Sequence, residues 1–530
     1  MSNSGFFISP PMGLVRLQHY LQERGIHCDI LDLDLRSQPD YLQRAIDGAY
    51  DVIGISVSHY NVTQDLELLW TVREAARRAG RRCLFVGGGQ EATMNYAQWL
   101  RMGIDVVLAG FAEKRLYDLC VRYAAASATT PLATVVDGMD GCGVVLSDGT
   151  IRFTPAAPLT EAEFHELSYA QLLKLRVPFS AYWEQVRGEI GTTNFHKNKF
   201  TVENARLFTS SHCPRGCGFC SSQTFLPASQ SKKLPIIMLT AAQVMTLLEH
   251  YANTYGAKSF LFSDDDFLVG SRPGLERAFE ISRHICTAKA AGALPVESHF
   301  SCQTRVVNFL HREDGVTRPH WAFIESLHEA GFHSVGLGVE TFSDRLLRCP
   351  SVNKVGITVA DCRMAVDALL ARGLLPQINL ILAVPESTVD EMVHSMRVGA
   401  EYIRQGCQVA VTALMKAIPG APMLTSRDYA HTTLAWTNPE TGRAVEIAHY
   451  FLPHDPQIAA IVNQIEPASE EELRRWKANS PWQGGTTPKF LVGLATFIAV
   501  CRLLNRHDDA AYFADVTSSV IAEVDRVAVI

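Results

Sequence analysis

Short apolar runs alternate with amphipathic stretches along most of this chain, and the alternation occurs in two series. In the first series the apolar runs cover residues 6–9, 28–35, 52–57, 83–86 and 106–109. The stretches between them carry apolar side chains at helical spacing. Strands that alternate with helices form a parallel sheet with helices on its faces. We therefore predict an α/β fold that begins with a doubly wound, flavodoxin-like parallel sheet.

A second series of strand-like runs starts near residue 204 and has longer intervals. Its later members cover residues 259–263, 298–304, 334–339, 377–384 and 409–414. Helical stretches such as residues 242–255 and 321–330 separate them. This pattern predicts a partial, six-stranded (β/α) barrel of the TIM type, whose active site lies at the carboxyl ends of the strands. After residue 426 we expect a loop and then a mostly helical extension.

The length of 530 residues indicates about three domains rather than one core. We divide the chain into the sheet domain (1–130), a connector with a hairpin around Asp148-Gly149 (131–199), the barrel (200–425) and a region that covers the substrate (426–530). The net charge of −7 argues against binding to nucleic acid. Thirteen mostly scattered cysteines do not resemble a disulfide framework. With neither a signal peptide nor a span of membrane length, we expect a cytoplasmic protein.

Three cysteines stand within eight residues in the spacing Cys-x3-Cys-x2-Cys: Cys213, Cys217 and Cys220. Three thiolates can hold three corners of a [4Fe–4S] cluster and leave the fourth iron open to a ligand. A zinc site would need four ligands, and His212 is poorly placed to be the fourth. We expect Gly216 and Gly218 to supply the backbone angles for a tight wrap around the cluster. The segment therefore predicts an iron–sulfur centre with an open iron.

This segment resembles the signature of the radical S-adenosylmethionine (SAM) superfamily, with Phe219 as its aromatic residue. The resemblance implies that the open iron binds the amino and carboxylate groups of SAM. It also implies that the reduced cluster cleaves SAM to a 5′-deoxyadenosyl radical, so that the three cysteines are catalytic as well as metal-binding. An external electron donor of the flavodoxin or ferredoxin type would reduce the cluster.

Polar residues at the ends of the barrel strands fit the same resemblance. Asp264 and Asp265 belong to an acidic run that the resemblance places near the SAM amino group, although one of them could instead cap a helix. Asp266 stands where the family usually has asparagine. Arg305 could pair with the SAM carboxylate or form a salt bridge at the barrel mouth. Glu340 is the expected contact with the SAM ribose or amino group.

Small residues gather at the predicted carboxyl edge of the first sheet: Pro11, Gly13, Ser56, Ser58, Gly87, Gly88 and Gly89. They would leave room for a bulky ligand at the switch in strand order, although each could also serve only a tight turn. The region resembles the cobalamin-binding domain that precedes the barrel in one class of radical SAM enzymes. Because the chain lacks Asp-x-His-x-x-Gly, we expect cobalamin to bind without a histidine ligand. His59 is the only local candidate, and we expect it to be exposed or structural.

The two resemblances together imply a cobalamin-dependent radical SAM enzyme. In this class the usual outcome is transfer of a methyl group from SAM, via methylcobalamin, to an unactivated carbon or to phosphorus. Cyclisation or rearrangement on the same scaffold is the main alternative, and a cobalamin or redox sensor without turnover is a distant one. The substrate is expected to be a small metabolite or a natural-product intermediate.

Overall fold

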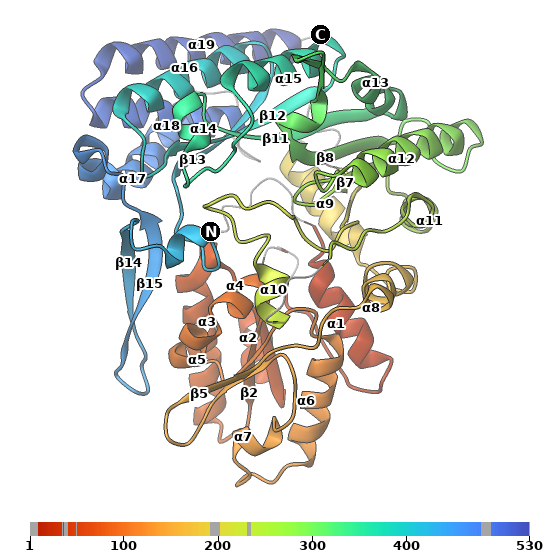
Figure 1. The fold of residues 1–530 in the computed structure, drawn as a ribbon. Coiled ribbons are helices and arrows are strands. Elements are labelled where there is room, and N and C mark those ends of the chain that lie inside the picture. Colours follow the sequence, from red (N-terminus) through yellow and green to blue (C-terminus); the bar gives the residue numbers. More distant parts are fainter. Residues whose placement is uncertain are drawn as a thin grey trace.

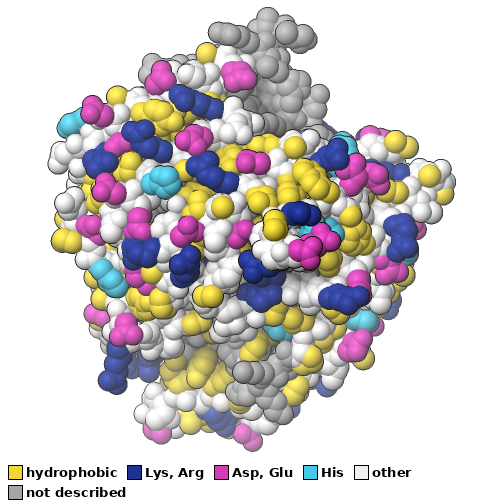
Figure 2. Space-filling view, turned by 45° about the horizontal axis from the view of Figure 1, so that its top comes forward, with side chains coloured by type: hydrophobic (Ala, Val, Ile, Leu, Met, Phe, Trp, Pro, Cys, Tyr) yellow, Lys and Arg dark blue, Asp and Glu magenta, His cyan; other side chains and the backbone are white. Residues whose placement is uncertain are grey.

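The computed structural model describes residues 9–33, 35, 41–48, 50–190, 202–230, 235–478 and 489–528. It places an N-terminal sheet domain below a (β/α) barrel, with the C-terminal helices packed beside the barrel (Figure 1). Among the described helices, none is both long enough and apolar enough to cross a bilayer. Figure 2 shows acidic and basic side chains interspersed over one face of the molecule, with no broad basic patch on that face.

The N-terminal sheet has five strands in the order β1-β2-β3-β4-β5. Three parallel strands come first: β1 (Val52–Ser56), β2 (Leu84–Gly88) and β3 (Val106–Leu108). The antiparallel hairpin of β4 (Cys142–Val145) and β5 (Ile151–Thr154) extends the sheet. The hairpin predicted around Asp148-Gly149 is therefore confirmed. Helices α3 (Val62–Arg78), α5 (Tyr96–Met102) and α6 (Glu113–Ala125) contribute buried residues to the core of this domain.

The strand predicted at residues 28–35 is wrong for the part that the structure describes. The first predicted strand, residues 6–9, lies almost entirely outside the described residues. Hydrogen bonds from other elements reach the described part of this segment from side chains and not from a neighbouring strand. Gln18 Nε2 and Gln22 Nε2 donate to the Cys28 carbonyl at 2.9 and 3.1 Å, and Tyr182 donates to Asp32 at 2.6 Å. The segment thus links α1 (Met12–Gln22) to α9 (Phe179–Ile190).

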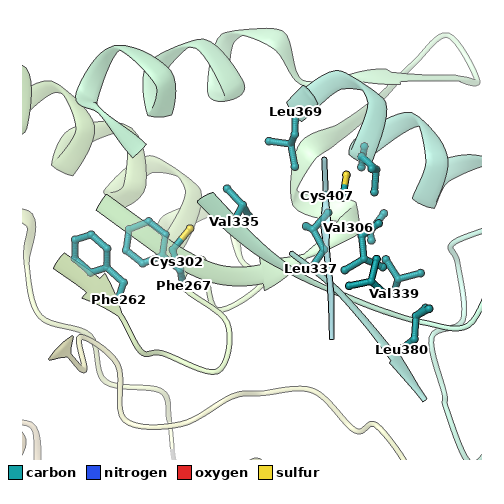
Figure 3. Packing of buried hydrophobic residues seen from close by; sticks show 14 of the residues in the cluster. Phe262, Phe267, Cys302, Val306, Val335, Leu337, Val339, Leu369, Leu380 and Cys407 are labelled. Carbon is teal, nitrogen blue, oxygen red and sulfur yellow. The ribbon is translucent and has the colours of Figure 1, made fainter. Parts of the chain in front are cut away.

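The barrel sheet has six parallel strands in the order β13-β12-β11-β8-β7-β6. They are β6 (Asn204–Leu207), β7 (Ser259–Phe262), β8 (His299–Arg305), β11 (Phe332–Glu340), β12 (Leu375–Ala383) and β13 (Gln408–Leu414). The helices α11 (Ala241–Tyr255), α12 (Arg272–Ala290), α13 (Trp321–Ala330), α15 (Val359–Ala371) and α16 (Val389–Arg404) cover the strands. Buried residues such as Phe262, Cys302 and Val335 form the core between strands and helices (Figure 3). The predicted barrel is confirmed.

The C-terminal region contains a hairpin that the sequence did not predict. Residues expected to form a loop pair as β14 (His431–Thr437) and β15 (Ala444–Phe451). The hairpin extends along the N-terminal domain (Figure 1), where the ring centroid of Trp436 lies 6.2 Å from that of Trp70. The expected helical end follows as α17 (Pro456–Ala478), α18 (Lys489–Leu503) and α19 (His507–Ala528), with α18 almost wholly buried.

Candidate active site between the two domains

A cavity of about 400 Å³ lies between the sheet domain and the barrel. One wall is made by residues that follow strands β1 and β2: Val57, Ser58, His59, Gln90 and Glu91. The facing wall is made by the cysteine loop and Glu340. Strands β12 and β13 and the segment after β13 supply the remainder, including Asn379, Thr412 and Lys416. The cavity therefore joins the two edges at which the sequence predicted ligands.

Direct contacts fix the sheet domain against the cysteine loop. The Gln90 side chain, at the start of α4 (Gln90–Met94), donates to Ser221 Oγ at 2.8 Å. Helix α4 also packs against α10 (Phe225–Gln230), which follows the loop. Thr224 Oγ1 donates to the carbonyl of Gly420 at 2.8 Å and ties the loop to the segment after β13. These contacts set the spacing between the two walls of the cavity.

Asp264 anchors the start of the cysteine loop. Its buried carboxylate accepts hydrogen bonds from the backbone N–H and the hydroxyl of both Thr209 and Ser210, all at 2.6–2.7 Å. A carboxylate offers about four acceptor sites, and these four bonds, three to Oδ1 and one to Oδ2, occupy most of them. Asp264 is thus committed to positioning the loop, and we do not carry it forward as a SAM contact.

Gly218 is required by close packing rather than by an unusual backbone angle. Neither Gly216 nor Gly218 has a positive φ, so the expectation that they supply special angles is wrong. A Cβ on Gly218 would lie 2.2 Å from the Pro350 carbonyl oxygen, whereas the nearest atom to a Cβ on Gly216 is 3.5 Å away. The Gly218 carbonyl also accepts from the Met423 N–H at 3.1 Å. The loop is therefore pressed against the backbone at residues 350–351.

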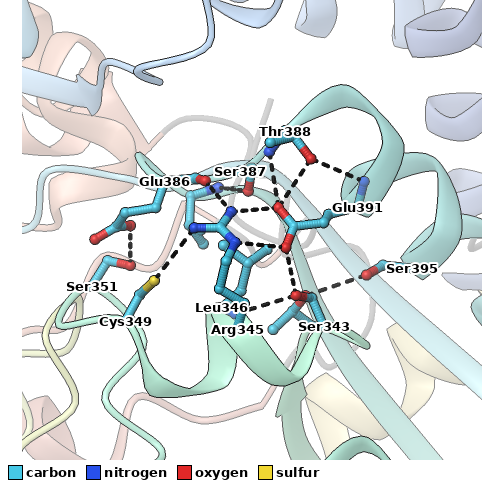
Figure 4. A network of polar contacts seen from close by, with 12 residues as sticks. Ser343, Arg345, Leu346, Cys349, Ser351, Glu386, Ser387, Thr388, Glu391 and Ser395 are labelled. Atoms are coloured by element: carbon cyan, nitrogen blue, oxygen red, sulfur yellow. Dashed lines mark hydrogen bonds and ion pairs between the residues drawn. The ribbon is translucent and has the colours of Figure 1, made fainter.

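A polar network holds the segment that presses on Gly218 (Figure 4). Arg345 Nε and Ser343 Oγ donate to Glu391 Oε1 at 3.0 and 2.7 Å, and Ser351 donates to Glu386. Although burial opposes the effect, the hydrogen bonds from Arg345 and Ser343 lower the pKa of Glu391 to about 2. The segment from 343 to 351 is thus tied to the start of α16, and it forms a firm outer support for the cysteine loop.

The cysteine loop fits a cubane cluster better than a single metal ion. Cys213, Cys217 and Cys220 are all half-buried, and Cys220 lines the cavity. Burial, with smaller contributions from Asp266 and Asp265, raises the pKa of Cys213 to about 12. Thiolates in such a place need positive charge from a metal. Within the described residues, no three His, Cys, Asp or Glu side chains are arranged to bind one metal ion. In a cubane cluster, by contrast, each cysteine binds a different iron.

The acidic run after β7 divides into two roles beyond that of Asp264. Asp266 is buried and accepts from Thr304 Oγ1 at 2.7 Å and from Arg305 Nε at 2.8 Å. The salt bridge considered for Arg305 is therefore present, yet Arg305 still has N–H groups on its terminal nitrogens for a carboxylate. Asp265 reaches accessible space, and partial burial together with Asp264 and Asp266 raises its pKa. A bound cation would relieve that electrostatic cost.

Glu340 is held in a strained conformation at the cavity wall. Its φ is +68°, in the left-handed region that bulky residues rarely adopt. The register of β11 against β12 shifts between Gly338 and Glu340, which marks a bulge. Lys354 Nζ lies 2.8 Å from Glu340 Oε1, and a Cβ on Gly338 would lie 2.7 Å from both groups. Strain of this kind is typical of functional sites.

The predicted cobalamin edge is partly assembled around the ends of β1 and β2. Ser56 is opposite Gly88 in the parallel register, and Gly89, with φ +96°, begins the turn into α4. Ser58 lines the cavity and donates its backbone N–H to Asp65. Gly87 is explained by packing, because its Cβ would lie 3.2 Å from the Ile104 side chain. Pro11 and Gly13 lie apart from the cavity lining, at the start of α1.

The sequence reasoning missed several cavity residues. Glu91 and His59 form a buried pair with 3.5 Å between Oε2 and Nδ1, so of the two roles expected for His59, exposed or structural, exposure is excluded. Lys416 lines the cavity two residues after β13. Asn379 and Thr412 reach the cavity from within β12 and β13. Lys416, just beyond its strand end, offered a positional signal, but no recognisable motif.

Two family descriptions match separate parts of the chain. The model for the B12 binding domain matches residues 4–119, and the model for the radical SAM superfamily matches residues 207–398. No curated protein matches the chain significantly. The predicted cofactor set of cobalamin, [4Fe–4S] cluster and SAM is thus the one that these two kinds of domain use.

Solved structures of similar fold cover nearly all of the chain. The radical SAM methyltransferase TsrM from Kitasatospora setae, with cobalamin and a [4Fe–4S] cluster, is 14% identical with a TM-score of 0.59, over 96% of this chain and 97% of that one. TsrM with tryptophan substrate and the SAM analogue aza-SAM is 15% identical with a TM-score of 0.57, over 85% and 84%. The cobalamin-dependent SAM radical enzyme OxsB with aqua-cobalamin is 13% identical with a TM-score of 0.62, over 99% and 79%. Identities this low show a common fold.

Proposed function

The chain is a cobalamin-dependent radical SAM enzyme, and from that premise we propose that it is a methyltransferase. It would move a methyl group from SAM, by way of cobalamin, to an unactivated carbon or phosphorus of a small metabolite or natural-product intermediate. One observation carries the proposal: a single cavity of about 400 Å³ is lined by both cofactor edges. A substrate in this cavity would lie between the two cofactors. TsrM, a methyltransferase, shares the overall fold.

The cofactors supply the difficult chemistry when bound: SAM on the cluster is the source of a 5′-deoxyadenosyl radical, and cobalamin carries the methyl group. The role of this chain is to hold and orient them. Cys213, Cys217 and Cys220 would bind three irons of the cluster. Asp265 and Glu340 would accept hydrogen bonds from the amino or ribose groups of SAM. The terminal nitrogens of Arg305 would donate to the carboxylate of SAM. Phe219 lines the cavity beside them.

The strand ends indicate how a substrate would be held. Leu380, Ile381 and Met415 give the cavity an apolar side. Lys416 is half-buried and brings a cationic group to the lining of the same cavity. We therefore expect a substrate with an apolar body and an anionic group that pairs with Lys416.

The C-terminal region supports this role. Lys416 forms an isolated backbone bridge with Tyr450 of β15, so the hairpin backs the wall of the cavity. This contact supports a substrate-covering role for residues 426–530. We propose that this region follows a cobalamin domain (1–130), a connector (131–199) and the barrel (200–425). We further propose that a flavodoxin or ferredoxin supplies the electron that reduces the cluster.

The experiment is an anaerobic turnover assay with candidate metabolites, SAM, cobalamin and a reductant. A methyltransferase of this kind uses one SAM as methyl donor and one as radical source, so S-adenosylhomocysteine and 5′-deoxyadenosine should form in about equal amounts. Deoxyadenosine without S-adenosylhomocysteine would instead indicate a cyclase or rearrangement enzyme. Cys217→Ala should abolish deoxyadenosine formation, whereas Cys286→Ala on α12 should not.

A further inference from the structure

We infer that His59 supplies an axial imidazole nitrogen to the cobalt of bound cobalamin, with Glu91 holding its ring in place. The inference rests on the proposed cobalamin site and reverses the sequence-based expectation of cobalamin without a histidine ligand. His59 was not among the small residues that indicated the site in the sequence. The inference depends on where the structure places its side chain.

His59 lies at the ligand edge of the sheet domain. It begins the short helical turn His59–Asn61, three residues beyond the end of β1. The neighbouring Ser58 also lines the cavity, and its backbone N–H is held by Asp65 Oδ2 at 3.0 Å. Strand β1 ends at Ser56, opposite Gly88 of β2. The carboxyl ends of such strands are where an α/β sheet binds its cofactor, so His59 is located where cobalamin is expected.

The imidazole is buried and directed by a carboxylate. The His59 side chain is 6% exposed and that of Glu91 is 4% exposed, with Nδ1 and Oε2 3.5 Å apart. Glu91 is itself fixed, because Trp99 Nε1 and Asn95 Nδ2 approach its Oε1 at 3.4 and 3.3 Å. A carboxylate on one ring nitrogen is the usual arrangement behind a metal-binding histidine, since it sets the orientation and basicity of the other nitrogen.

The other described residues of the cavity offer no equivalent ligand. His59 is the one imidazole among those that line it. Lys416 carries an ammonium group, which has no free electron pair for a metal. The amide nitrogens of Gln90 and Asn379 are donors of hydrogen bonds and not of electron pairs. Cys220 belongs to the cluster loop. His59 is therefore the nitrogen ligand that this wall can offer to cobalt.

Coordination of this kind transfers no electron and breaks no covalent bond. The neutral imidazole donates the electron pair of one ring nitrogen to cobalt and replaces a water molecule or the nucleotide base of cobalamin itself. Glu91 retains the proton on the other nitrogen through its negative charge. The predicted consequence is a nitrogen signature that comes from the protein.

The test is electron paramagnetic resonance of cob(II)alamin bound to the full-length protein labelled with nitrogen-15 histidine. Cobalamin of natural isotopic composition is the probe. A histidine ligand splits each cobalt line into a doublet, whereas the nucleotide base of cobalamin would give a triplet. We expect the doublet in the wild-type protein. A triplet, or no nitrogen splitting, would overturn the inference while leaving cobalamin binding established; failure to take up cobalamin would instead contradict the proposed function.

Three variants assign the doublet to one residue. His59→Ala should remove it, and His449→Ala, which changes a nearby histidine outside the cavity lining, should leave it in place. Glu91→Gln keeps the His59 imidazole but weakens the charge behind it, so the size of the splitting should change. A doublet that persists in His59→Ala would show that another histidine is the ligand. A splitting that is unaltered in Glu91→Gln would overturn the role of Glu91 in holding the ring.

Discussion

Replacing Gly218 with alanine should displace the cysteine loop, and Gly216 provides a matched control two residues away. The added Cβ at Gly218 would lie 2.2 Å from the Pro350 carbonyl oxygen and 2.7 Å from that of Ser351. Both obstacles are backbone atoms, so no flexible side chain can turn aside. The segment that carries them is tied to Glu391 and Glu386 and cannot yield without losing those bonds.

The magnitude follows from this geometry. Overpacking of a buried position costs about 1–3 kcal/mol when backbone must shift, and a barrel of this size loses roughly 2–4 °C of melting temperature per kcal/mol. We therefore expect Gly218→Ala to lower the thermal midpoint of the barrel by several degrees. Because the loop moves as it accommodates the methyl group, we also expect most of the bound iron and sulfide to be lost. At Gly216 the nearest atom would lie 3.5 Å from the added methyl group, an ordinary contact.

The assay is iron and sulfide content after anaerobic reconstitution, together with calorimetric melting. Gly218→Ala should hold less than a third of the wild-type iron, whereas Gly216→Ala should hold nearly the full amount. Equal iron content in the two variants would refute the claim that contact with residues 350–351 shapes the loop. A loss at Gly216 alone would likewise contradict the account, because the alanine methyl group has ordinary contacts there.

Three further changes test other parts of the site. Asp264→Ala should bind less cluster and lose about 2–4 kcal/mol of stability, because the N–H groups of Thr209 and Ser210 lose their acceptor. Asp264→Asn should lose less iron and less melting temperature, because three of the four bonds go to one oxygen, which asparagine keeps. Burial raises the pKa of Asp65 to about 6, so the folded protein keeps a proton that the unfolded chain has lost between about pH 4 and 6, and stability falls as pH rises through that interval. Asp65→Asn should therefore stabilise the protein above pH 6 by about 3 kcal/mol, seen as a higher melting temperature, and have little effect near pH 4; equal effects at both pH values would contradict this account. Lys416→Met should raise the KM for an anionic substrate about tenfold, or about 1.4 kcal/mol, with a smaller change in kcat, and Lys416→Arg should restore most of it; an unchanged KM would remove Lys416 from substrate binding.

The barrel could be predicted from the sequence because its strands are short buried runs with polar ends. Strand β7 was predicted at residues 259–263 and observed at Ser259–Phe262, and β12 was predicted at 377–384 and observed at Leu375–Ala383. Burial of both faces gives such strands an apolar signal that needs no knowledge of their neighbours. The cysteine motif was equally local, since its spacing lies within one loop.

The errors arose where distant residues decide the structure. The hairpin β14–β15 carries many polar residues, and it is stabilised by contact of Val445, Ile447 and Trp436 with the N-terminal core. Gly218 is determined by backbone more than a hundred residues away. The pairing of His59 with Glu91 depends on how the β1 and β2 turns approach each other, which spacing alone does not reveal.

The central claim is that a methyl group passes from SAM to the substrate in the interdomain cavity. Its most direct test is mass spectrometry of the product formed with SAM that carries a fully deuterated methyl group. The account predicts a product that has gained one methyl group with all three deuterium atoms, alongside equal amounts of S-adenosylhomocysteine and 5′-deoxyadenosine. A product without deuterium, formed together with deoxyadenosine alone, would contradict it.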